Sequence, residues 1–367
     1  MIKILFIAPV DNSRNGGIAS WAKSYINNYK HSEYKLIPTN IPALRNDRRG
    51  LIGRFCAGIK QIIGLIENIK LSLKNNQNVA IAHITTSGNM GSLRDWIIGR
   101  YLHKKGIKCV MHCHYGCVTD DVKSNNLVGT LVRKAMHEYD QVWVLDSTSF
   151  KTLKNIESLA DRVYLTPNSI EVNNTIDLTP KSYKNVAFIG NLIPTKGIFE
   201  LIDACLLTDV RLDLIGPGQD DILVKVREKV GEQLNKRVYI HGRLSNQDAV
   251  NFMRKVDIVA LPTYFPSEAF PISILEAMSL TKMVISCPRS AIPDMLTSLD
   301  GSPCGILVEP RSADSISEAI KWCQNNNREA DIMCQNAYKK VDSCYKKDIV
   351  FEIYTNNYNK LFIDDTN

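Results

Sequence analysis

Short runs rich in valine, isoleucine and leucine recur along the chain, separated by longer segments in which apolar residues return every third or fourth position. The short runs are apolar at successive positions, which is typical of parallel strands buried on both faces. The longer segments, such as that around Ile18, Trp21 and Tyr25, have the spacing of amphipathic helices. The predicted strands are residues 2–8, 78–84, 108–113, 141–146, 185–190, 211–216 and 257–262. This alternation predicts an α/β protein with doubly wound parallel sheets and binding sites at the carboxyl ends of the strands.

The alternation is interrupted once, by the polar stretch 169–185, after which a strand, a loop and a helix occur again. We interpret this stretch as a linker between two similar Rossmann-like domains. A length of 367 residues also favours two domains over one. The predicted N-terminal domain covers residues 1–172, the predicted C-terminal domain covers residues 180–345, and residues 346–367 contain a final helix.

The composition is that of a globular protein, with 44% hydrophobic residues, 23% charged residues, 20 glycines and 14 prolines. Collagen-like, disordered and disulfide-rich classes are excluded, because each needs a skew that is missing here. The ten cysteines are scattered, without the paired spacing of a secreted disulfide framework. The apolar run from Ile4 to Val10 is far shorter than the ~20 residues that span a bilayer. We therefore expect a cytoplasmic protein whose cysteines are mostly buried.

Charge is divided unevenly along the chain. Residues 1–170 carry 23 Lys and Arg against 12 Asp and Glu, whereas residues 171–367 carry 22 against 26. A basic half is typical of a domain that meets an anionic partner, and solvated surface lysines are the alternative interpretation.

One segment of the basic half, residues 45–74, has the pattern of a membrane-surface helix. Its apolar face contains Ile59, Ile62, Ile63, Ile66 and Leu73. Its basic surround contains Arg45, Arg48, Arg49, Arg54, Lys60, Lys70 and Lys74. We expect peripheral association with an anionic membrane, at the cytoplasmic face of the inner membrane. The alternative is that the isoleucines cover the sheet and the cations are solvated.

Two carboxylates stand out in residues 262–280, where a predicted strand leads into a helix. Glu276 lies four residues from both Ile272 and Leu280, so its carboxylate is on an apolar stripe and needs a partner. A ribose diol, with two hydroxyl donors, is suitable. Glu268 precedes the helix N-terminus, where free N–H groups could hold sugar or phosphate oxygens. A salt bridge to a nearby Lys or Arg is the alternative for each carboxylate.

Two glycine-containing turns could bind phosphate. Lys196 is expected at the start of a helix, where the helix dipole disfavours a cation unless an anion such as a diphosphate is bound. An exposed lysine is the alternative. Gly16 and Gly17 come after the first strand and permit close backbone approach to a phosphate or an acceptor. Neither a G-x-G-x-x-G fingerprint nor a P-loop is present, so nicotinamide and P-loop nucleotide classes are not favoured.

A cluster of histidines and cysteines ends the strand 108–113, in the segment MHCHYGC. Such residues are possible ligands of zinc, but side chains one or two apart on a strand point to opposite faces or mostly into the core, and no C-x-x-C pair occurs. We therefore expect no metal here. His114, just before the loop that begins Tyr115-Gly116, is the better candidate for a hydrogen-bonding or polarising group in a cleft.

Taken in order, these segments resemble the retaining GT-B glycosyltransferases of family 4, the glycosyl transferases group 1. SEAFPISILEAMSL (267–280) is similar to the Glu-x7-Glu signature of that family. Further similarities cover nearly the whole chain: the Gly-Gly loop, a His-x-Gly element, TPNSI (166–170), G-x-x-x-x-x-K-G (190–197), LIGPG (214–218) and GILVEP (305–310).

The resemblance implies a GT-B fold, with two Rossmann-like domains facing across a cleft and a C-terminal helix returning to the first domain. It implies that Glu276 binds the nucleotide ribose, Glu268 the donor sugar, and Lys196 the diphosphate. Gly17 would approach the diphosphate, and His114 would contact the transferred sugar. The catalytic residues would be Glu268, His114 and Lys196. The donor-binding residues would be Gly16, Gly17, Gly190, Asn191, Lys196, Glu268, Ala269, Phe270 and Glu276.

Three positions depart from the family pattern. Asn191 stands where many members have an Arg that helps to hold the diphosphate, Pro271 where Gly is frequent, and Ser169 where a turn glycine is usual. Pro271 cannot donate a backbone hydrogen bond. These departures concern the details of phosphate and sugar contact.

The implied function is retaining, metal-independent transfer of a sugar from a nucleotide-sugar, expected to be a UDP-sugar, in surface polysaccharide synthesis. The expected partners are this donor, which is a substrate and not a cofactor, a saccharide or lipid-linked acceptor, and the membrane surface, but no nucleic acid. No Asp-x-Asp motif, the usual metal-diphosphate clamp of the other common glycosyltransferase fold, occurs in the sequence. A sugar-nucleotide epimerase and a non-catalytic nucleotide-binding scaffold are the alternatives.

Overall fold

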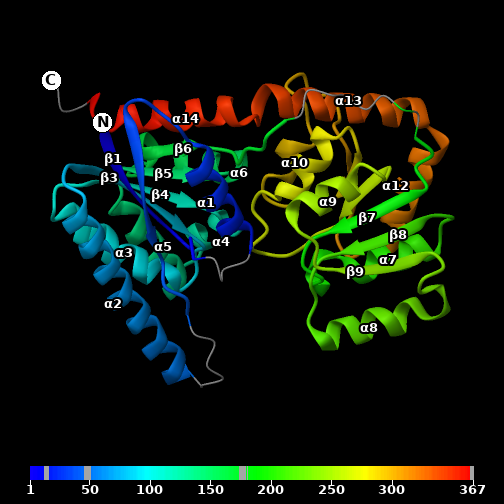
Figure 1. Cartoon of the computed structure of the whole chain (residues 1–367), viewed down its shortest axis with the longest axis horizontal. Helices are drawn as coiled ribbons and strands as arrows, with labels where there is room; N and C mark the ends of the chain where they lie inside the picture. The colour runs from blue at the N-terminus through cyan, green and yellow to red at the C-terminus, as the bar shows by residue number, and fades with distance from the viewer. Residues whose placement is uncertain (12–15, 45–50, 173–178, 180, 364–367) are drawn as a thin grey trace. The chain divides into compact units, whose positions relative to one another are not determined.

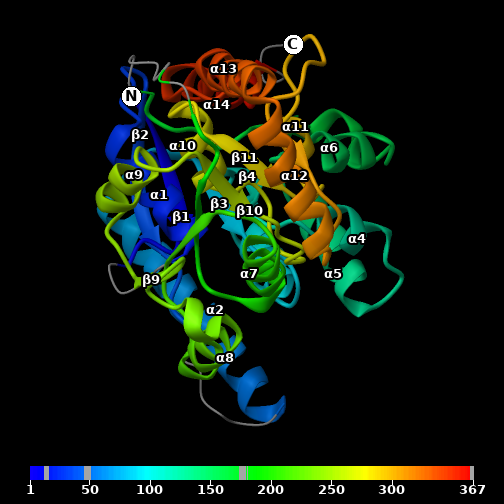
Figure 2. The same cartoon turned by 90° about the vertical axis from the view of Figure 1, so that its right-hand side faces the viewer.

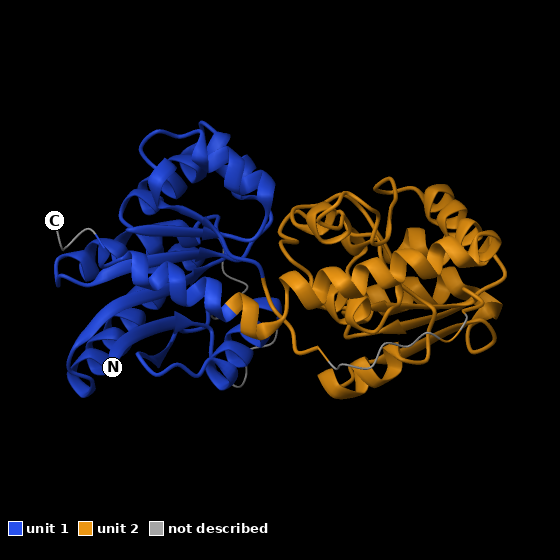
Figure 3. Ribbon diagram, turned by 90° about the horizontal axis from the view of Figure 1, so that it is seen from above, with its two compact units in different colours: residues 1–167, 351–367 blue, residues 168–350 orange. Residues whose placement is uncertain are grey.

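The computed structural model describes the chain except for residues 12–15, 45–50, 173–178, 180 and 364–367. The described chain forms two compact units (Figure 3). Unit 1 comprises Met1–Pro167 with Phe351–Asn367, and unit 2 comprises Asn168–Val350. Each unit is built on a six-stranded parallel sheet, which confirms the predicted α/β class with two Rossmann-like parallel-sheet domains.

The sheet of unit 1 has the strand order β2-β1-β3-β4-β5-β6 (Figure 1). Its strands are β1 (Ile2–Ala8), β2 (Tyr34–Asn40), β3 (Val79–Thr86), β4 (Lys108–Cys113), β5 (Gln141–Val144) and β6 (Val163–Leu165). Its helices are α1 (Gly17–Asn28), α2 (Leu51–Asn75), α3 (Gly91–His103), α4 (Val118–Lys123), α5 (Leu127–His137) and α6 (Ser147–Lys154), with a 3-10 turn at Ala160–Arg162. One face of the sheet packs against α2, α3 and α5, and the other packs against aromatic side chains of α1 and α14 (Lys347–Lys360).

The sheet of unit 2 has the strand order β12-β11-β10-β7-β8-β9. Its strands are β7 (Asn185–Ile189), β8 (Arg211–Ile215), β9 (Val238–Gly242), β10 (Ile258–Leu261), β11 (Met283–Ser286) and β12 (Ile306–Leu307). Its helices are α7 (Ile198–Leu206), α8 (Asp220–Val230), α9 (Asn246–Met253), α10 (Ile272–Ser279), α11 (Ile292–Met295), α12 (Ala313–Asn325) and α13 (Asn327–Cys344), with 3-10 turns at Pro194–Lys196 and Gly231–Gln233. Helices α7 and α12 pack together, as do α10 and α13.

The seven predicted strands are confirmed as β1, β3, β4, β5, β7, β8 and β10, with ends within two residues. The predictions missed five strands. Of these, β2 carries Pro38 at the sheet edge, and β12 is only two residues long, too short for a periodicity signal. Near the start of the predicted linker 169–185, Ile170 forms a β-bridge, in which its N–H donates to Tyr345 O. Residues 173–178 and 180 lie outside the described residues.

The final helix α14 begins in unit 2 and belongs to unit 1 from Phe351 onward. Within unit 1, Tyr354 and Tyr358 are fully buried, and the Tyr354 hydroxyl donates to Pro167 O at 2.9 Å. Seven of the ten cysteines are buried and all are free thiols, as expected. In the part of the chain that the structure describes, no helix combines the length and the apolar character needed to cross a membrane.

Candidate active site

The turn between β7 and α7 is held against the loop after β10 by a close backbone contact. Gly197 has φ +76°, and a Cβ atom there would lie 2.3 Å from the carbonyl oxygen of Pro262. Tyr264 N–H also donates to Thr195 O at 2.9 Å. Only glycine fits this position, since a side chain would meet both strain and backbone. Lys196 therefore lies two residues before α7, at the end of a 3-10 turn and not at the helix start as predicted.

Lys196 and Glu268 are in direct contact. The Lys196 ammonium lies 3.1 Å from Oε2 of Glu268, with the two side chains only 16% and 11% exposed. Thr263 donates to the same carboxylate oxygen at 3.3 Å. Gly190 borders the ammonium, because a Cβ at Gly190 would lie 3.8 Å from Lys196 Nζ. The structure thus brings Gly190, Lys196 and Glu268 together, and the alternative interpretation of Glu268, a salt bridge, also describes its present partner.

Glu276 lies on α10, one side of which is buried in unit 2. Its carboxylate is half-buried, and burial raises the pKa of Glu276 to about 7, opposed by a hydrogen bond with the Asn246 side chain. Within the described residues Glu276 forms no ion pair, so its partner is an amide and not a Lys or Arg. Pro271 is the N-cap of α10 rather than a residue of its first turn. A carboxylate that is costly to ionise is suited to receive hydroxyl donors.

The remaining predicted donor-site positions of unit 2 are Asn191, Ala269 and Phe270. Asn191 directly follows Gly190 and has an exposed side chain. The side chain of Phe270 is buried against the ring of Tyr345, with the ring centroids 5.4 Å apart. Ala269 accepts from Ala291 N–H at 3.1 Å through its carbonyl. Ala269 and Phe270 therefore shape the loop, and their side chains offer no polar group to a ligand.

Four polar residues beside this site were not predicted from the sequence. Tyr264 donates to Glu200 Oε1 at 3.1 Å, and the Arg311 guanidinium lies 4.9 Å from the centroid of the Tyr264 ring. Asn246, at the start of α9, is the partner of Glu276. The place of Tyr264 in the sequence could have indicated it. Tyr264 follows β10 closely, at the carboxyl edge of the sheet, where ligands bind in parallel α/β sheets.

His114 follows β4 in unit 1 and packs against two rings. Its imidazole centroid lies 4.1 Å from the ring centroids of Trp21 and of His112. Its Nε2 atom is buried and has no hydrogen-bond partner among the described residues. Burial lowers the pKa of His114 to about 3, so the imidazole is neutral near pH 7. A buried ring nitrogen without a partner is able to accept or donate one hydrogen bond to a ligand.

The neighbouring His112 is already engaged. Its Nδ1 lies 3.2 Å from Nε2 of His83, and its Nε2 lies 3.4 Å from the Thr166 hydroxyl. His83 in turn lies 2.5 Å from the Tyr358 hydroxyl of α14. Among residues that the structure describes, no group of three or more His, Cys, Asp or Glu side chains has metal-binding geometry.

Gly16 and Gly17 lie where α1 begins, one turn before Trp21. Gly16 has φ +135°, and no atom lies within 4 Å of a Cβ built on either glycine. Because Trp21 packs on His114, the Gly-Gly turn and His114 share one corner of unit 1. The other residues of this loop, 12–15, lie outside the described residues.

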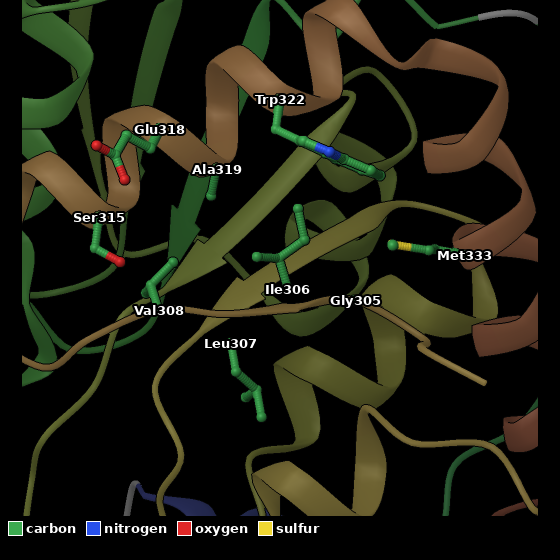
Figure 4. A pocket seen from close by; sticks show the side chains of 9 residues that line it. All are labelled: Gly305, Ile306, Leu307, Val308, Ser315, Glu318, Ala319, Trp322 and Met333. Atoms are coloured by element: carbon green, nitrogen blue, oxygen red, sulfur yellow. The ribbon is translucent and has the colours of Figure 1, made fainter. Parts of the chain in front are cut away.

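A pocket of about 460 Å³ occurs in unit 2 between β12, α12 and α13 (Figure 4). Trp322 and Met333 face Ile306 across it, and Glu318 is its one charged lining residue. None of the predicted donor-site residues lines this pocket, so we do not assign the donor site to it.

The fold and the site define a class. The structure is similar over 99% of the chain to sucrose-phosphate synthase (tll1590) from Thermosynechococcus elongatus, covering all of that chain, with a TM-score of 0.77 and 16% identity. It is similar over 98% of the chain to Anabaena Alr3699/HepE in complex with UDP and glucose, again covering all of that chain, with a TM-score of 0.70 and 15% identity. The protein therefore has the GT-B fold.

Residues 170–340, which contain Lys196, Glu268 and Glu276, match the family model described as glycosyl transferases group 1. This match lies within unit 2. A curated relative, O-antigen chain mannosyltransferase C from Escherichia coli, is 23% identical over 174 residues, which are 47% of this chain and 46% of that protein. The chain thus spans about half the length of the curated relatives it matches.

Proposed function

We propose that the protein is a glycosyltransferase that moves a sugar from a nucleotide-sugar to a saccharide or lipid-linked saccharide acceptor. The observation that carries this proposal is the contact between Lys196 and Glu268, eight residues before the half-buried Glu276. A cation and two carboxylates at the carboxyl ends of parallel strands fit the three parts of such a donor: diphosphate, sugar and ribose. The match of residues 170–340 with the family model of glycosyl transferases group 1 supports the same activity.

In this proposal Glu276 holds the ribose. The ionised carboxylate accepts hydrogen bonds from the two ribose hydroxyls, which compensate the cost of its burial. Glu268 holds the hydroxyl groups of the sugar. Its contacts with Lys196 and Thr263 both involve Oε2. These contacts bind the donor before reaction and fix its position for transfer.

Lys196 stabilises the leaving group. Breaking the sugar C1–O bond develops negative charge on the departing diphosphate, and a partly buried ammonium stabilises that charge strongly. Glu268 neutralises this ammonium at 3.1 Å. When the diphosphate binds, it becomes a second anion for Lys196, and the Glu268 carboxylate becomes available to the sugar hydroxyls.

The finer features of the reaction are also proposals. We expect retention of anomeric configuration and catalysis without a metal ion, as the family resemblance implies. A UDP-sugar is the proposed donor, since the similar Anabaena protein was crystallised with UDP and glucose. A surface polysaccharide is the proposed product, since one relative is named as an O-antigen chain mannosyltransferase. His114 would then contact the transferred sugar through its unpartnered Nε2.

The test begins with the purified full chain and a panel of UDP-, GDP-, ADP- and CMP-sugars. A donor at 100 times its dissociation constant stabilises the folded protein by ~2.7 kcal/mol, which thermal shift detects. Release of nucleotide on addition of a saccharide acceptor then reports transfer. The Glu276→Ala variant should lose binding, Glu268→Ala should mainly lose turnover, and Glu228→Ala, on the exposed side of α8, should match the parent.

Each alternative has its own outcome. Tight nucleotide binding without turnover on any donor and acceptor would show a non-catalytic scaffold. Conversion of one nucleotide-sugar into its epimer, without transfer, would show an epimerase. Either result would overturn the proposed function.

A further inference from the structure

Helix α2 has two apolar faces, of which one packs against the rest of the described chain and the other is exposed. On the inner face Leu65 and Ile69 are fully buried in the core of unit 1. The same side is fixed by polar contacts, in which Gln61 donates to Pro42 O at 2.7 Å and Asn68 donates to Asn40 O at 3.0 Å. Packing against the sheet is therefore complete without the opposite face.

The opposite face carries Phe55, Ile59 and Ile63, which we call the outer stripe of α2. Their side chains are 62%, 43% and 51% exposed. The spacing of four residues places them in a line along the helix. In Figures 1 and 2 the beginning of α2 extends past the sheet of unit 1. Three adjacent large apolar side chains in water are unfavourable, and such patches mark interaction sites.

The isoleucine face predicted for residues 45–74 is thus divided between a buried and an exposed side. Ile66 and Leu73 pack against the core, as the alternative interpretation expects. Ile59 and Ile63 do not, so covering the sheet does not explain them. Arg45, Arg48 and Arg49 of the predicted basic surround lie outside the described residues, and the proposal does not depend on them.

The charge of α2 identifies the kind of partner. Arg54 and Lys60 are exposed next to Phe55 and Ile59 in the sequence, and Lys70 and Lys74 are exposed further along the helix. Glu67 is the one acidic residue between Gly53 and Asn75. An apolar line flanked by cations matches an anionic bilayer, in which acyl chains lie directly beneath negatively charged headgroups.

We propose that the outer stripe of α2 inserts into the interface of an anionic membrane while Arg54 and Lys60 contact its headgroups. This inference rests on the proposed function, in that a lipid-linked acceptor is presented at such a surface. The helix lies in the interface and does not cross it. Binding therefore depends on both apolar contact and charge, and is weakened by salt.

Vesicle co-sedimentation of the full chain tests the proposal. Vesicles of phosphatidylcholine alone are compared with vesicles that also contain phosphatidylglycerol, at low and high salt. We expect binding to the anionic vesicles only, and release by salt. The variant Phe55→Ser, Ile59→Ser, Ile63→Ser should bind at least ~10-fold more weakly. Arg54→Glu with Lys60→Glu should also reduce binding.

The matched control removes three similarly exposed apolar side chains from unit 2, as Leu207→Ser, Val224→Ser and Ile332→Ser. This control should bind vesicles like the parent. Circular dichroism and thermal unfolding establish that both triple variants fold. Transfer to a water-soluble acceptor should be unchanged in the outer-stripe variant, since the stripe contains none of the residues assigned to the proposed site.

Undiminished vesicle binding by the folded outer-stripe variant would overturn the proposal. So would a dimer, seen by light scattering, that the same variant dissociates, because the stripe would then be a contact between copies of this chain. Failure of the proposed function is distinguishable from failure of this proposal. It would appear as a parent protein that binds anionic vesicles but transfers no sugar.

Discussion

The ammonium of Lys196 lies 3.1 Å from Oε2 of Glu268, in a site where both side chains are largely buried. Each group therefore compensates the charge of the other. Removing one partner of such a pair is costly, because the other charge is left in a poorly solvated place. In the proposed function the same pair provides the cation for a diphosphate.

Lys196→Ala should lower turnover about 10²-fold or more, because a cation at the departing diphosphate acts mainly in the transition state. Steady-state kinetics with a saturating donor measures this change in kcat. Lys184→Ala is the matched control, since that lysine is 61% exposed in its ion pair with Asp209. Equal kcat in the Lys196 variant and in the control would contradict the assignment.

Turnover should persist in excess EDTA. The expected charge stabilisation comes from Lys196, and the sequence has no Asp-x-Asp clamp for a metal-bound diphosphate. Initial rates before and after chelation, with a metal-dependent glycosyltransferase assayed in parallel, make the measurement. A complete loss of activity that Mn²⁺ or Mg²⁺ restores would disprove this prediction.

Much of the site was predictable because spacing and sheet edges determine it. Glu268 and Glu276 are eight residues apart on a loop and the following helix, and Lys196 follows another strand of the same sheet. Parallel strands bring their carboxyl ends to one edge, so these loops were expected at the same edge, and they meet there because β7 and β10 are neighbours. The direct ion pair was not predictable, because it depends on the contact of Gly197 with the Pro262 carbonyl.

The fold was less predictable where a strand is very short or where both faces of a helix are apolar. Strand β12 has two residues, and β11 has four residues close to the helix that precedes it. In α2 both faces are rich in isoleucine, so periodicity alone could not separate the buried Ile69 from the exposed Ile63. Tertiary packing decides between such faces, and the sequence of one helix does not contain it.

Gly197→Ala should destabilise unit 2 strongly, by about 3 kcal/mol or more, because a Cβ would meet both the Pro262 carbonyl and a left-handed backbone. Gly106→Ala, in unit 1, is the matched control. Gly106 also has a positive φ, of +70°, but no atom lies within 4 Å of a Cβ there, so about 1 kcal/mol is expected. Urea unfolding midpoints compare the two variants. Equal destabilisation would show that the carbonyl contact is unimportant.

The neutral, buried His114 should make the protein less stable in acid. Its pKa is about 3 in the folded protein and about 6.5 when unfolded, so the folded state resists protonation. The stability it contributes is complete above pH 6.5 and is lost as pH falls toward 3. Between pH 6.5 and pH 5 the loss is about 2 kcal/mol for this residue. Urea unfolding at pH 6.5 and pH 5, repeated with His114→Asn, should show a smaller loss of unfolding free energy in the variant. An identical loss would contradict the assignment of this acid sensitivity to His114.

Glu276 should make donor binding depend on pH near neutrality, a range in which an ordinary surface carboxylate stays ionised. Burial raises the pKa of Glu276 to about 7, and only the ionised carboxylate accepts hydrogen bonds from both ribose hydroxyls. Affinity should therefore fall as pH is lowered through 7, and should be about tenfold weaker at pH 6 than at pH 8.

UDP-glucose is the suitable probe, because its phosphates do not titrate in this range as the terminal phosphate of UDP does. Calorimetric titration of the parent should show this dependence, and Glu276→Gln should bind weakly at every pH. A Glu276→Gln variant that kept the same pH dependence would assign the titrating group elsewhere.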